Sequence, residues 1–155
     1  MHLSRDADFL NNVVNDPSVF PYISYGFKDP VDVGPLIRDE KNYFFANSFG
    51  GFLVINKGSG IYEIHSQFLP EGRGLSAILA AREAMEYMFT NTDCTVLITD
   101  CPKDNPAARI LAKKAGLVKI GEHMLLHIPC DIYATTKDKW ISENTECQQF
   151  QQSSQ

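Results

Sequence analysis

The stretch PEGRGLSA, residues 70–77, separates a strand-like run from a run with helical spacing, and it decides the fold. A turn between a strand and a helix leaves backbone N–H groups unpaired at the positive end of the helix dipole, which favours an anion. Gly72 and Gly74 would let an anion approach the backbone closely, and Arg73 would add a charge-assisted hydrogen bond. The alternative is that the two glycines only turn the chain.

The residues before this turn predict a helix, a long loop and three strands. Apolar residues between Leu3 and Val14 share one helical stripe, with Ser4 or Asp6 as the candidate cap. Residues 17–41 hold four of the eight prolines and little periodicity, which predicts a long loop with at most one helical turn. The runs NYFFANS, GFLVINKG and GIYEIHSQFL then predict three consecutive strands joined by tight turns.

The residues after the turn predict two helices and three further strands. The helix at 75–89 is expected to bury a set of apolar side chains, namely Ile78, Leu79, Ala81, Met85 and Met88. CTVLITD, at 94–100, is a nearly continuous apolar run, typical of a strand covered on both faces. Asn105 as N-cap and Gly116 as C-terminal glycine bound a second helix. LVKIGEHMLLHI and DIYATT predict the last strands, and Trp140 is expected to anchor a terminal helix.

Length and composition predict one domain. A chain of 155 residues with 44% hydrophobic content is long enough to bury its own core. We expect the domain to span residues 1–142, followed by a polar, flexible tail at 143–155. The net charge of -5 argues against a general nucleic-acid surface, because phosphate neutralisation dominates non-specific affinity.

The termini and the cysteines predict a cytoplasmic protein without a metal site. The first residues lack the apolar core of a signal peptide, and no window is long and apolar enough for a membrane span. Four cysteines, at 94, 101, 130 and 147, form no CxxC pair, so neither a zinc site nor a disulfide framework is indicated. His123 and His127 would share one face of a strand, but two histidines without a third ligand do not define a metal site.

This order of elements resembles the GNAT acyltransferase superfamily. In that family the turn reads roughly Pro-Glu-x-Arg-Gly-x-Gly-x-Gly/Ala and binds the pyrophosphate of acetyl-coenzyme A; residues 70–78 match its first half. The second helix resembles the family's Asn-x-x-Ala-x-x-Leu-Tyr-x-x-x-Gly-Phe motif, with matches at Asn105, Ala108, Leu111 and Gly116. The resemblance covers about residues 43–122.

The resemblance implies an α/β fold and an acyl transfer. The fold would be a single GNAT-like domain whose mixed, mostly antiparallel sheet is flanked by helices and splayed between the strand ending near Phe68 and the strand at 94–100. The activity would be an acyl-CoA-dependent N-acyltransferase, which moves an acetyl group from acetyl-CoA to an amine. The implied cofactor contacts are Phe68, Leu69, Arg73, Gly74, Leu75, Ser76, Asn105 and Ala108.

Glu63 and His65 are the catalytic candidates. Strand alternation places Ile61, Glu63, His65 and Gln67 on one face, and in the resembling family a carboxylate or a water wire on this strand serves as base. The alternative for both residues is a polar strand face covered by a loop.

The departures from the family pattern support a second hypothesis. Ser76 and Ile78 replace glycine or small residues, and Ala112 replaces the tyrosine that can protonate the departing thiolate. The combination IHSQFLPEGRG and CPKDNPAARILAKKAGL looks most like a GNAT subgroup encoded by tailed bacteriophages. The second hypothesis is therefore a non-catalytic phage protein in virion assembly or genome delivery, which contacts phage or host proteins through the 17–41 loop or the tail.

Overall fold

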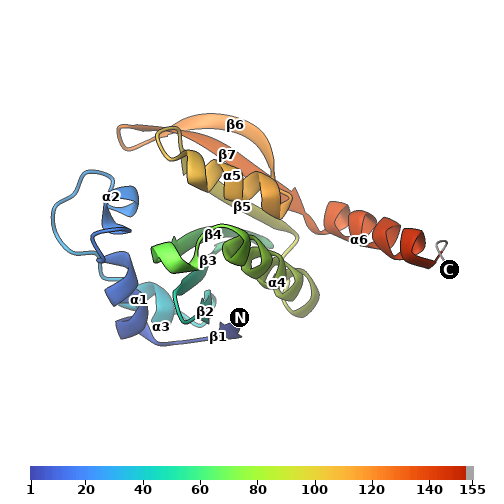
Figure 1. Cartoon of the computed structure of the whole chain (residues 1–155), viewed down its shortest axis with the longest axis horizontal. Coiled ribbons are helices and arrows are strands. Elements are labelled where there is room, and N and C mark those ends of the chain that lie inside the picture. The colour runs from blue at the N-terminus through green and yellow to red at the C-terminus, as the bar shows by residue number, and fades with distance from the viewer. Residues whose placement is uncertain (153–155) are drawn as a thin grey trace.

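A mixed β-sheet with helices on both faces organises the chain in the computed structural model, which describes residues 1–152 and their side chains up to residue 144 (Figure 1). The elements are β1 His2–Leu3, α1 Ala7–Val14, α2 Phe20–Ile23, α3 Gly34–Arg38, β2 Tyr43–Asn47, β3 Gly50–Gly58, β4 Ile61–Phe68, a 3-10 turn Pro70–Gly72, α4 Leu75–Asn91, β5 Val96–Pro102, α5 Pro106–Ala115, β6 Val118–Leu125, β7 Ile128–Thr136 and α6 Lys137–Gln152. The strand order is β1-β2-β3-β4-β5-β7-β6. Neighbouring strands are antiparallel except for β4 and β5, which are parallel.

The capping residues predicted from the sequence bound two of the helices. Asp6 caps α1, because its carboxylate accepts the N–H of Phe9 at 2.8 Å. Asn105 caps α5 in the same way, and α5 ends at Gly116 in the left-handed conformation. The prediction that the first helix includes Leu3 is wrong, since Leu3 pairs with Phe45 in the sheet as part of β1.

The long loop predicted at 17–41 contains two short helices, α2 and α3, and is tied to α1 by asparagine side chains. The side chain of Asn15 bonds both the N–H and the carbonyl of Val31, each at 2.8 Å. The oxygen of Asn11 accepts the N–H of Val33 at 2.8 Å. These bonds replace the backbone pairing that a loop lacks, so the segment is held over the sheet.

The two faces of the sheet bury separate cores. One core lies under α4 and α5 and includes Val54, Ile64 and Leu97. The other lies under α1 and α3 and includes Leu53 and Phe44. Figure 1 shows α4 and α1 on opposite sides of β3 and β4.

The buried side of α4 differs from the prediction at Leu79, and Ile78 is only half-buried. Leu79 is 51% exposed, whereas alanines at 77, 80, 81 and 84 are buried. Because these small side chains form the inner face, the helix can lie close to the sheet. The larger Leu79 lies on the opposite, solvent-facing side of the helix.

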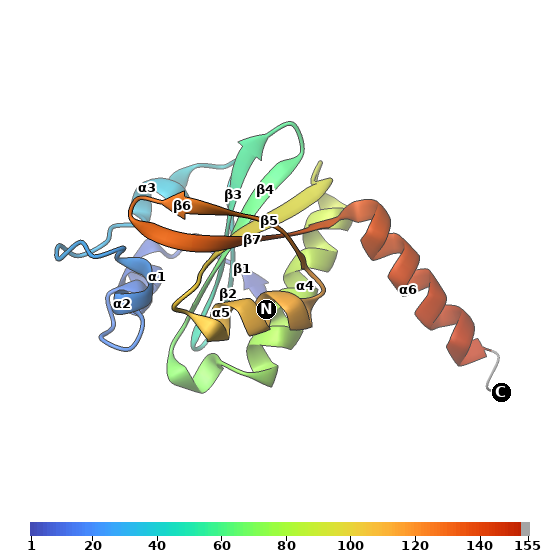
Figure 2. The ribbon, with the colours of Figure 1, turned by 90° about the horizontal axis from the view of Figure 1, so that it is seen from above.

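The strands β4 and β5 pair only near their first residues and then diverge. Their parallel ladder consists of three residue pairs, from Ile61 with Val96 to Glu63 with Ile98. Beyond that point β4 continues to Phe68 and β5 to Pro102 without pairing to each other. Figure 2 shows the two strands diverging. The splay that the resemblance implied is present at the expected strands.

The terminal helix α6 leaves the body of the protein, as Figures 1 and 2 both show. Trp140, near its start, packs on Phe89 of α4 with ring centroids 5.8 Å apart, as the sequence predicted for this anchor. The predicted tail, 143–155, is helical through Gln152, and its last three residues lie outside the described part of the chain. The flexibility of this segment stays a prediction.

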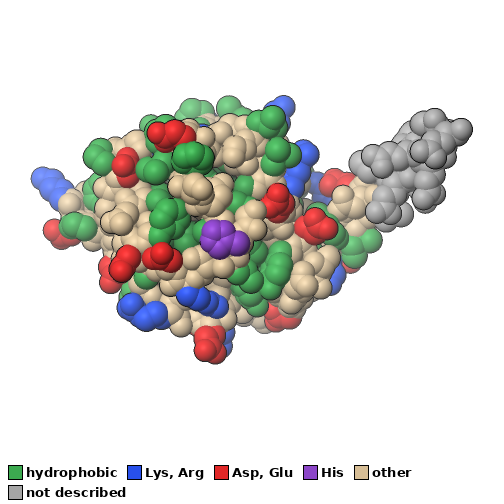
Figure 3. Space-filling view, turned by 60° about the horizontal axis from the view of Figure 1, so that its bottom comes forward, with side chains coloured by type: hydrophobic (Ala, Val, Ile, Leu, Met, Phe, Trp, Pro, Cys, Tyr) green, Lys and Arg blue, Asp and Glu red, His purple; other side chains and the backbone are tan. Residues whose placement is uncertain are grey.

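The charge of the surface and the character of the helices bear on whether nucleic acids or membranes are partners. On the face seen in Figure 3, acidic and basic side chains are interspersed, so among the described residues that face presents no continuous basic surface. Within residues 1–152, no helix combines the length and the apolar character that crossing a bilayer requires.

Glycine is needed at both positions of the turn, but for different structural reasons. Gly72 is buried, and a Cβ there would lie 2.7 Å from Cβ of Phe49 and 3.0 Å from Cδ1 of Phe68. Gly74 is the residue before α4 and has φ of 72°, a conformation that side-chain-bearing residues rarely adopt. The turn therefore depends on one glycine for space and on the other for backbone freedom.

We predict that Gly72→Ala lowers the free energy of unfolding by about 1–3 kcal/mol, because the added methyl group would clash with Cβ of Phe49 and with the buried ring of Phe68. Gly121→Ala is the matched control, since a Cβ there meets only Ile132 at an ordinary 3.9 Å. Denaturant unfolding of the three proteins measures both effects. Equal stability of Gly72→Ala and the parent protein would contradict this packing role.

Candidate active site

A cleft of about 480 Å³ lies where β4 and β5 diverge. Four groups of residues form its wall: Ile64–Phe68 from β4, Thr99–Pro102 from β5, residues from the first turns of α4 and from α5, and Val19, Tyr22, Ile23 and Tyr25 from the N-terminal segment. The segment that the sequence analysis assigned to a long loop thus forms one side of the cleft.

Backbone groups of β4 face this cleft without a ladder partner. The carbonyl of Gly60 accepts the N–H of Val96 at 3.1 Å, so even-numbered residues of this strand direct their backbone groups toward β5. The N–H of Leu69 points the other way, to the carbonyl of Phe49. Past the last ladder pair, Ser66 and Phe68 therefore present peptide groups to the cleft, which makes its edge a strand open to hydrogen bonding.

The first turn of α4 supplies further free donors at the end of β4. Gly74 has no side chain to cap the helix, and the N–H groups of Leu75, Ser76 and Ala77 have no acceptor among the described residues. Leu75 is 70% exposed and turned outward, so it leaves these donors uncovered. The turn therefore joins a strand to an uncapped helix N-terminus, as the sequence predicted.

Arg73 connects the turn to the N-terminal segment. Its Nε donates to the carbonyl of Phe68 at 3.0 Å, and its Nη2 donates to the carbonyl of Ser18 at 2.7 Å. The guanidinium group therefore holds the strand end and residue 18 together, while it still lines the cleft. This structural use of Arg73 was not predicted from the sequence.

The other predicted cofactor residues divide between side-chain and backbone roles. The side chains of Phe68, Asn105 and Ala108 line the cleft from opposite walls. Leu69 packs into the core under α1 and α3, and Leu75 and Ser76 lie outside the wall. For these last three residues, only the backbone peptide groups are available to a ligand in the cleft.

Glu63 and His65 are hydrogen-bonded on the face of β4 that the N-terminal segment covers. Oε1 of Glu63 lies 3.2 Å from Nε2 of His65, and its Oε2 lies 3.1 Å from Nζ of Lys57. The hydrogen bond with His65, helped by the charges of His65 and Lys57, lowers the pKa of Glu63 to about 2. Glu63 is therefore a fixed anion near neutral pH, and the imidazole beside it is the group suited to exchange a proton.

Gln67 continues this row toward the turn. It is 7% exposed, lines the cleft, and its Oε1 has no hydrogen-bond partner among the described residues. A buried amide without a partner costs free energy, which a bound group with a matching donor offsets.

The structure adds Tyr25 and Asp100 to the cleft, neither of which the sequence analysis singled out. Burial, together with the nearby Cys130, Asp100 and Glu63, raises the pKa of Tyr25, so its phenol stays protonated. Asp100 on β5 lies 3.0 Å from Nε2 of His123. Three aromatic residues in YISYGF, residues 22–27, were the available sequence signal, because aromatic side chains in a loop are typical of binding segments.

Three further residues of β5 and α5 have structural roles. Burial raises the pKa of Cys101 to about 12, so this thiol is not an activated nucleophile. Ala112 is buried on α5, where the motif that this helix resembles has tyrosine. Arg109, on the same helix, pairs with the buried Asp131 at 3.7 Å and so ties α5 to β7.

Comparison with solved structures identifies the fold. A spermidine N-acetyltransferase from Vibrio cholerae, solved with CoA and spermine, matches with a TM-score of 0.69 and 20% identity over 88% of this chain and 92% of its own. A GNAT-family acetyltransferase from Bacillus anthracis matches with a TM-score of 0.68 and 20% identity over 86% of this chain and 90% of its own. No protein-family model matches the sequence, and a comparison with curated proteins finds no match.

The fold is therefore that of the GNAT acetyltransferases, as a single α/β domain with a seven-stranded mixed sheet over the described residues. The strand splay, the uncapped helix and the cleft stand at the same places in the chain as the sequence motifs.

We predict that the stability contributed by Glu63 depends on pH. Because its pKa is lowered from 4.5 to about 2 in the folded protein, the contribution is complete above about pH 5 and is lost as the pH falls toward 2. Glu63→Gln should therefore cost about 2 kcal/mol at pH 7, and the difference from the parent should shrink steadily below pH 4.5. Denaturant unfolding at several pH values measures this; a difference independent of pH would refute the ion pair.

Proposed function

We propose that this protein is an acyl-CoA-dependent N-acyltransferase, which transfers an acetyl group from acetyl-CoA to an amine. One observation carries the proposal: a strand edge with free peptide groups leads directly to an uncapped helix N-terminus, along one continuous cleft. Such an edge suits an extended chain of amides, and such a helix end suits a phosphate. Acetyl-CoA has both in this order, as pantetheine followed by pyrophosphate.

The residues of the cleft fit the two parts of acetyl-CoA. The peptide groups of Ser66 and the N–H of Phe68 would bond the pantetheine amides, since the carbonyl of Phe68 already accepts from Arg73. The N–H groups of Leu75, Ser76 and Ala77 would bond the pyrophosphate, with Arg73 close by. The Vibrio cholerae protein of the same fold was solved with CoA, which supports this assignment of co-substrate.

The chemistry would run through His65. Since Nε2 of His65 bonds Glu63, its Nδ1 is left to accept the proton of the attacking amine. The amine nitrogen attacks the thioester carbonyl carbon, a free backbone N–H of β4 stabilises the developing oxyanion, and the C–S bond breaks. Because Ala112 carries no acidic group, water would protonate the thiolate of coenzyme A.

We also propose that the protein acts in the cytoplasm. Cys94, Cys101 and Cys130 are free thiols, which suits a reducing compartment, and acetyl-CoA would be available there.

The alternative is a non-catalytic phage protein of the same fold, in virion assembly or genome delivery. The missing acid at Ala112 and the use of Arg73 to bond Ser18 favour it. That hypothesis expects Leu75 or Ile78 to plug the phosphate turn, and the outward position of Leu75 argues against it. We therefore place the transferase first.

We predict that Leu75→Pro weakens CoA binding about tenfold, because it removes one N–H donor while proline is tolerated at the first helical position. Leu75→Ala is the matched control, since it removes the exposed side chain and keeps the N–H, and its affinity should equal that of the parent. Calorimetric titration with CoA measures all three affinities. Absence of binding to the parent at millimolar CoA would refute the proposed function.

We predict that His65→Ala lowers the rate of acetyl transfer about 100-fold or more, because the base is lost, while CoA affinity is unchanged. A thiol-release assay with acetyl-CoA and a panel of small amines measures the rate. If the parent binds CoA yet releases no thiol with any amine, the non-catalytic alternative is supported instead.

A further inference from the structure

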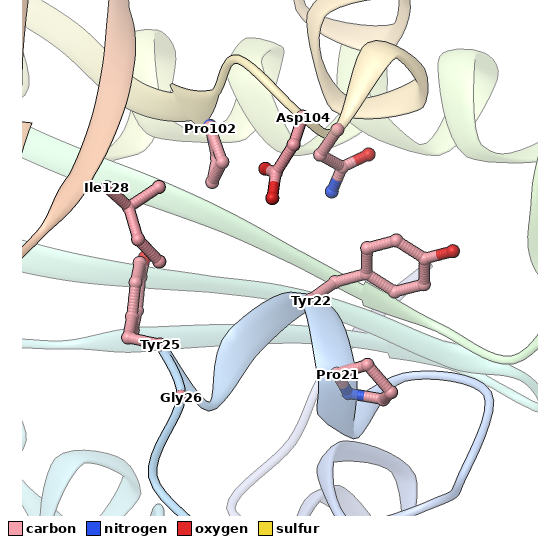
Figure 4. Close-up of a pocket in the computed structure, with 8 residues that line it drawn as sticks. Pro21, Tyr22, Tyr25, Gly26, Pro102, Asp104 and Ile128 are labelled. Atoms are coloured by element: carbon pink, nitrogen blue, oxygen red, sulfur yellow. The ribbon is translucent and has the colours of Figure 1, made fainter.

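A second cavity, of about 380 Å³, lies between α2 and the turn that joins β5 to α5 (Figure 4). Its wall consists of Pro21, Tyr22, Tyr25, Gly26, Pro102, Asp104, Asn105 and Ile128. Five of these residues, Tyr22, Tyr25, Pro102, Asp104 and Asn105, also line the cleft between β4 and β5. The two spaces therefore adjoin through a shared wall.

Three polar side chains of this cavity, those of Tyr22, Tyr25 and Asp104, are not used by the fold, whereas Asn105 caps α5. Figure 4 shows the carboxylate of Asp104 directed into the cavity, with Tyr22 and Tyr25 on the opposite side. None of these three side chains has a hydrogen bond or ion pair with another residue in the described part of the chain. The neighbouring Lys103 is turned away, because its Nζ lies 2.6 Å from Glu122 and 3.8 Å from Asp131. The carboxylate of Asp104 thus faces the cavity without a basic partner among the described residues.

The backbone holds Tyr25 in place at a conformational cost. Tyr25 has φ of 49°, and Gly26 after it has φ of 85°. A left-handed conformation is uncommon for an aromatic residue, and such strain is concentrated at functional sites. The turn after α2 therefore places the ring of Tyr25 on the wall that both cavities share.

A carboxylate facing two tyrosine rings is complementary to a positive nitrogen. The ring faces attract a cation and the carboxylate supplies an opposite charge, whereas an anion would be repelled. A neutral apolar ligand would remove Asp104 from water without a partner, at a cost in free energy. The two strand carboxylates nearest to this cavity already have partners: Asp100 faces His123, and Glu63 faces His65 and Lys57.

We propose that this cavity binds a second ammonium group of the acceptor, so that the substrate is a small aliphatic diamine. One nitrogen lies between Asp104 and the rings of Tyr22 and Tyr25, and the other reaches His65 through the shared wall. This inference rests on the proposed function for the reacting nitrogen, but the binding of a cation in the cavity stands apart from acetyl transfer.

The test compares α,ω-diaminoalkanes of three to six carbons with the n-alkylamines of equal length, with acetyl-CoA and a thiol-release assay. At the best chain length, kcat/KM should be at least tenfold higher for the diamine. Asp104→Asn should raise KM for the diamine about tenfold, leave kcat nearly unchanged, and leave the monoamine unaffected. Tyr22→Phe should keep the preference, because the ring face remains, and Tyr22→Leu should reduce it.

Asp138→Asn is the matched control, with the same change of charge on the exposed first turn of α6. It lies beyond the opposite end of β5 and β7, about 20 Å from Pro102 by the length of the strand. It should leave the diamine kinetics as in the parent. Equal kcat/KM for diamines and monoamines, with no effect of Asp104→Asn, would overturn the inference while the proposed function stands.

Direct binding separates the two proposals if no acetyl transfer is found. Calorimetric titration of the free protein with the same diamines should show binding that Asp104→Asn weakens about tenfold and Asp138→Asn does not. This result would support the cation site even if the transferase proposal failed. No binding of any diamine to the free protein at millimolar concentration, together with equal use of both amine classes, would reject the site.

Discussion

The parting of β4 from β5 is the constraint on which the rest of the structure depends. A parallel pair normally satisfies its peptide groups along its whole length, yet this ladder ends after Glu63 and Ile98. The remaining residues of both strands must therefore be covered by something other than each other. The helices α4 and α5 close one face of the gap, and the N-terminal segment closes the other.

Because different elements cover its two faces, the gap between β4 and β5 has two chemically different sides. The side under α4 and α5 is apolar and ends on free helix donors, which suits a long co-substrate with a phosphate at one end. The side under the N-terminal segment contains the ionisable groups, among them Glu63, His65 and Asp104. The proposed reaction needs both sides, because the thioester must meet an amine where the two sides join.

Much of the fold could be predicted because local chemistry determines it. Asn105 can cap a helix without any distant partner, and strand alternation alone places Glu63 and His65 together. The same local reasoning failed for Leu3, whose partner strand lies more than forty residues away, and for Leu79, where alanine packing decided which side faces the sheet. The proximity of Tyr25 to Asp104 could not be predicted from the sequence for the same reason, since only tertiary structure brings α2 beside the β5–α5 turn.

The strand order has a consequence for how the domain assembles. Three of the six neighbouring pairs in the sheet are hairpins with two-residue turns, whereas the pairing of β1 with β2 closes the longest connection, residues 4–42. Closing a loop of that length costs more chain entropy than closing the two-residue turns of the hairpins. The segment that supplies Tyr22 and Tyr25 lies inside this long loop, and the sheet it packs on must already exist to repay that cost. The side of the cleft formed by the N-terminal segment is thus the part of the molecule whose order depends most on the prior folding of the remainder.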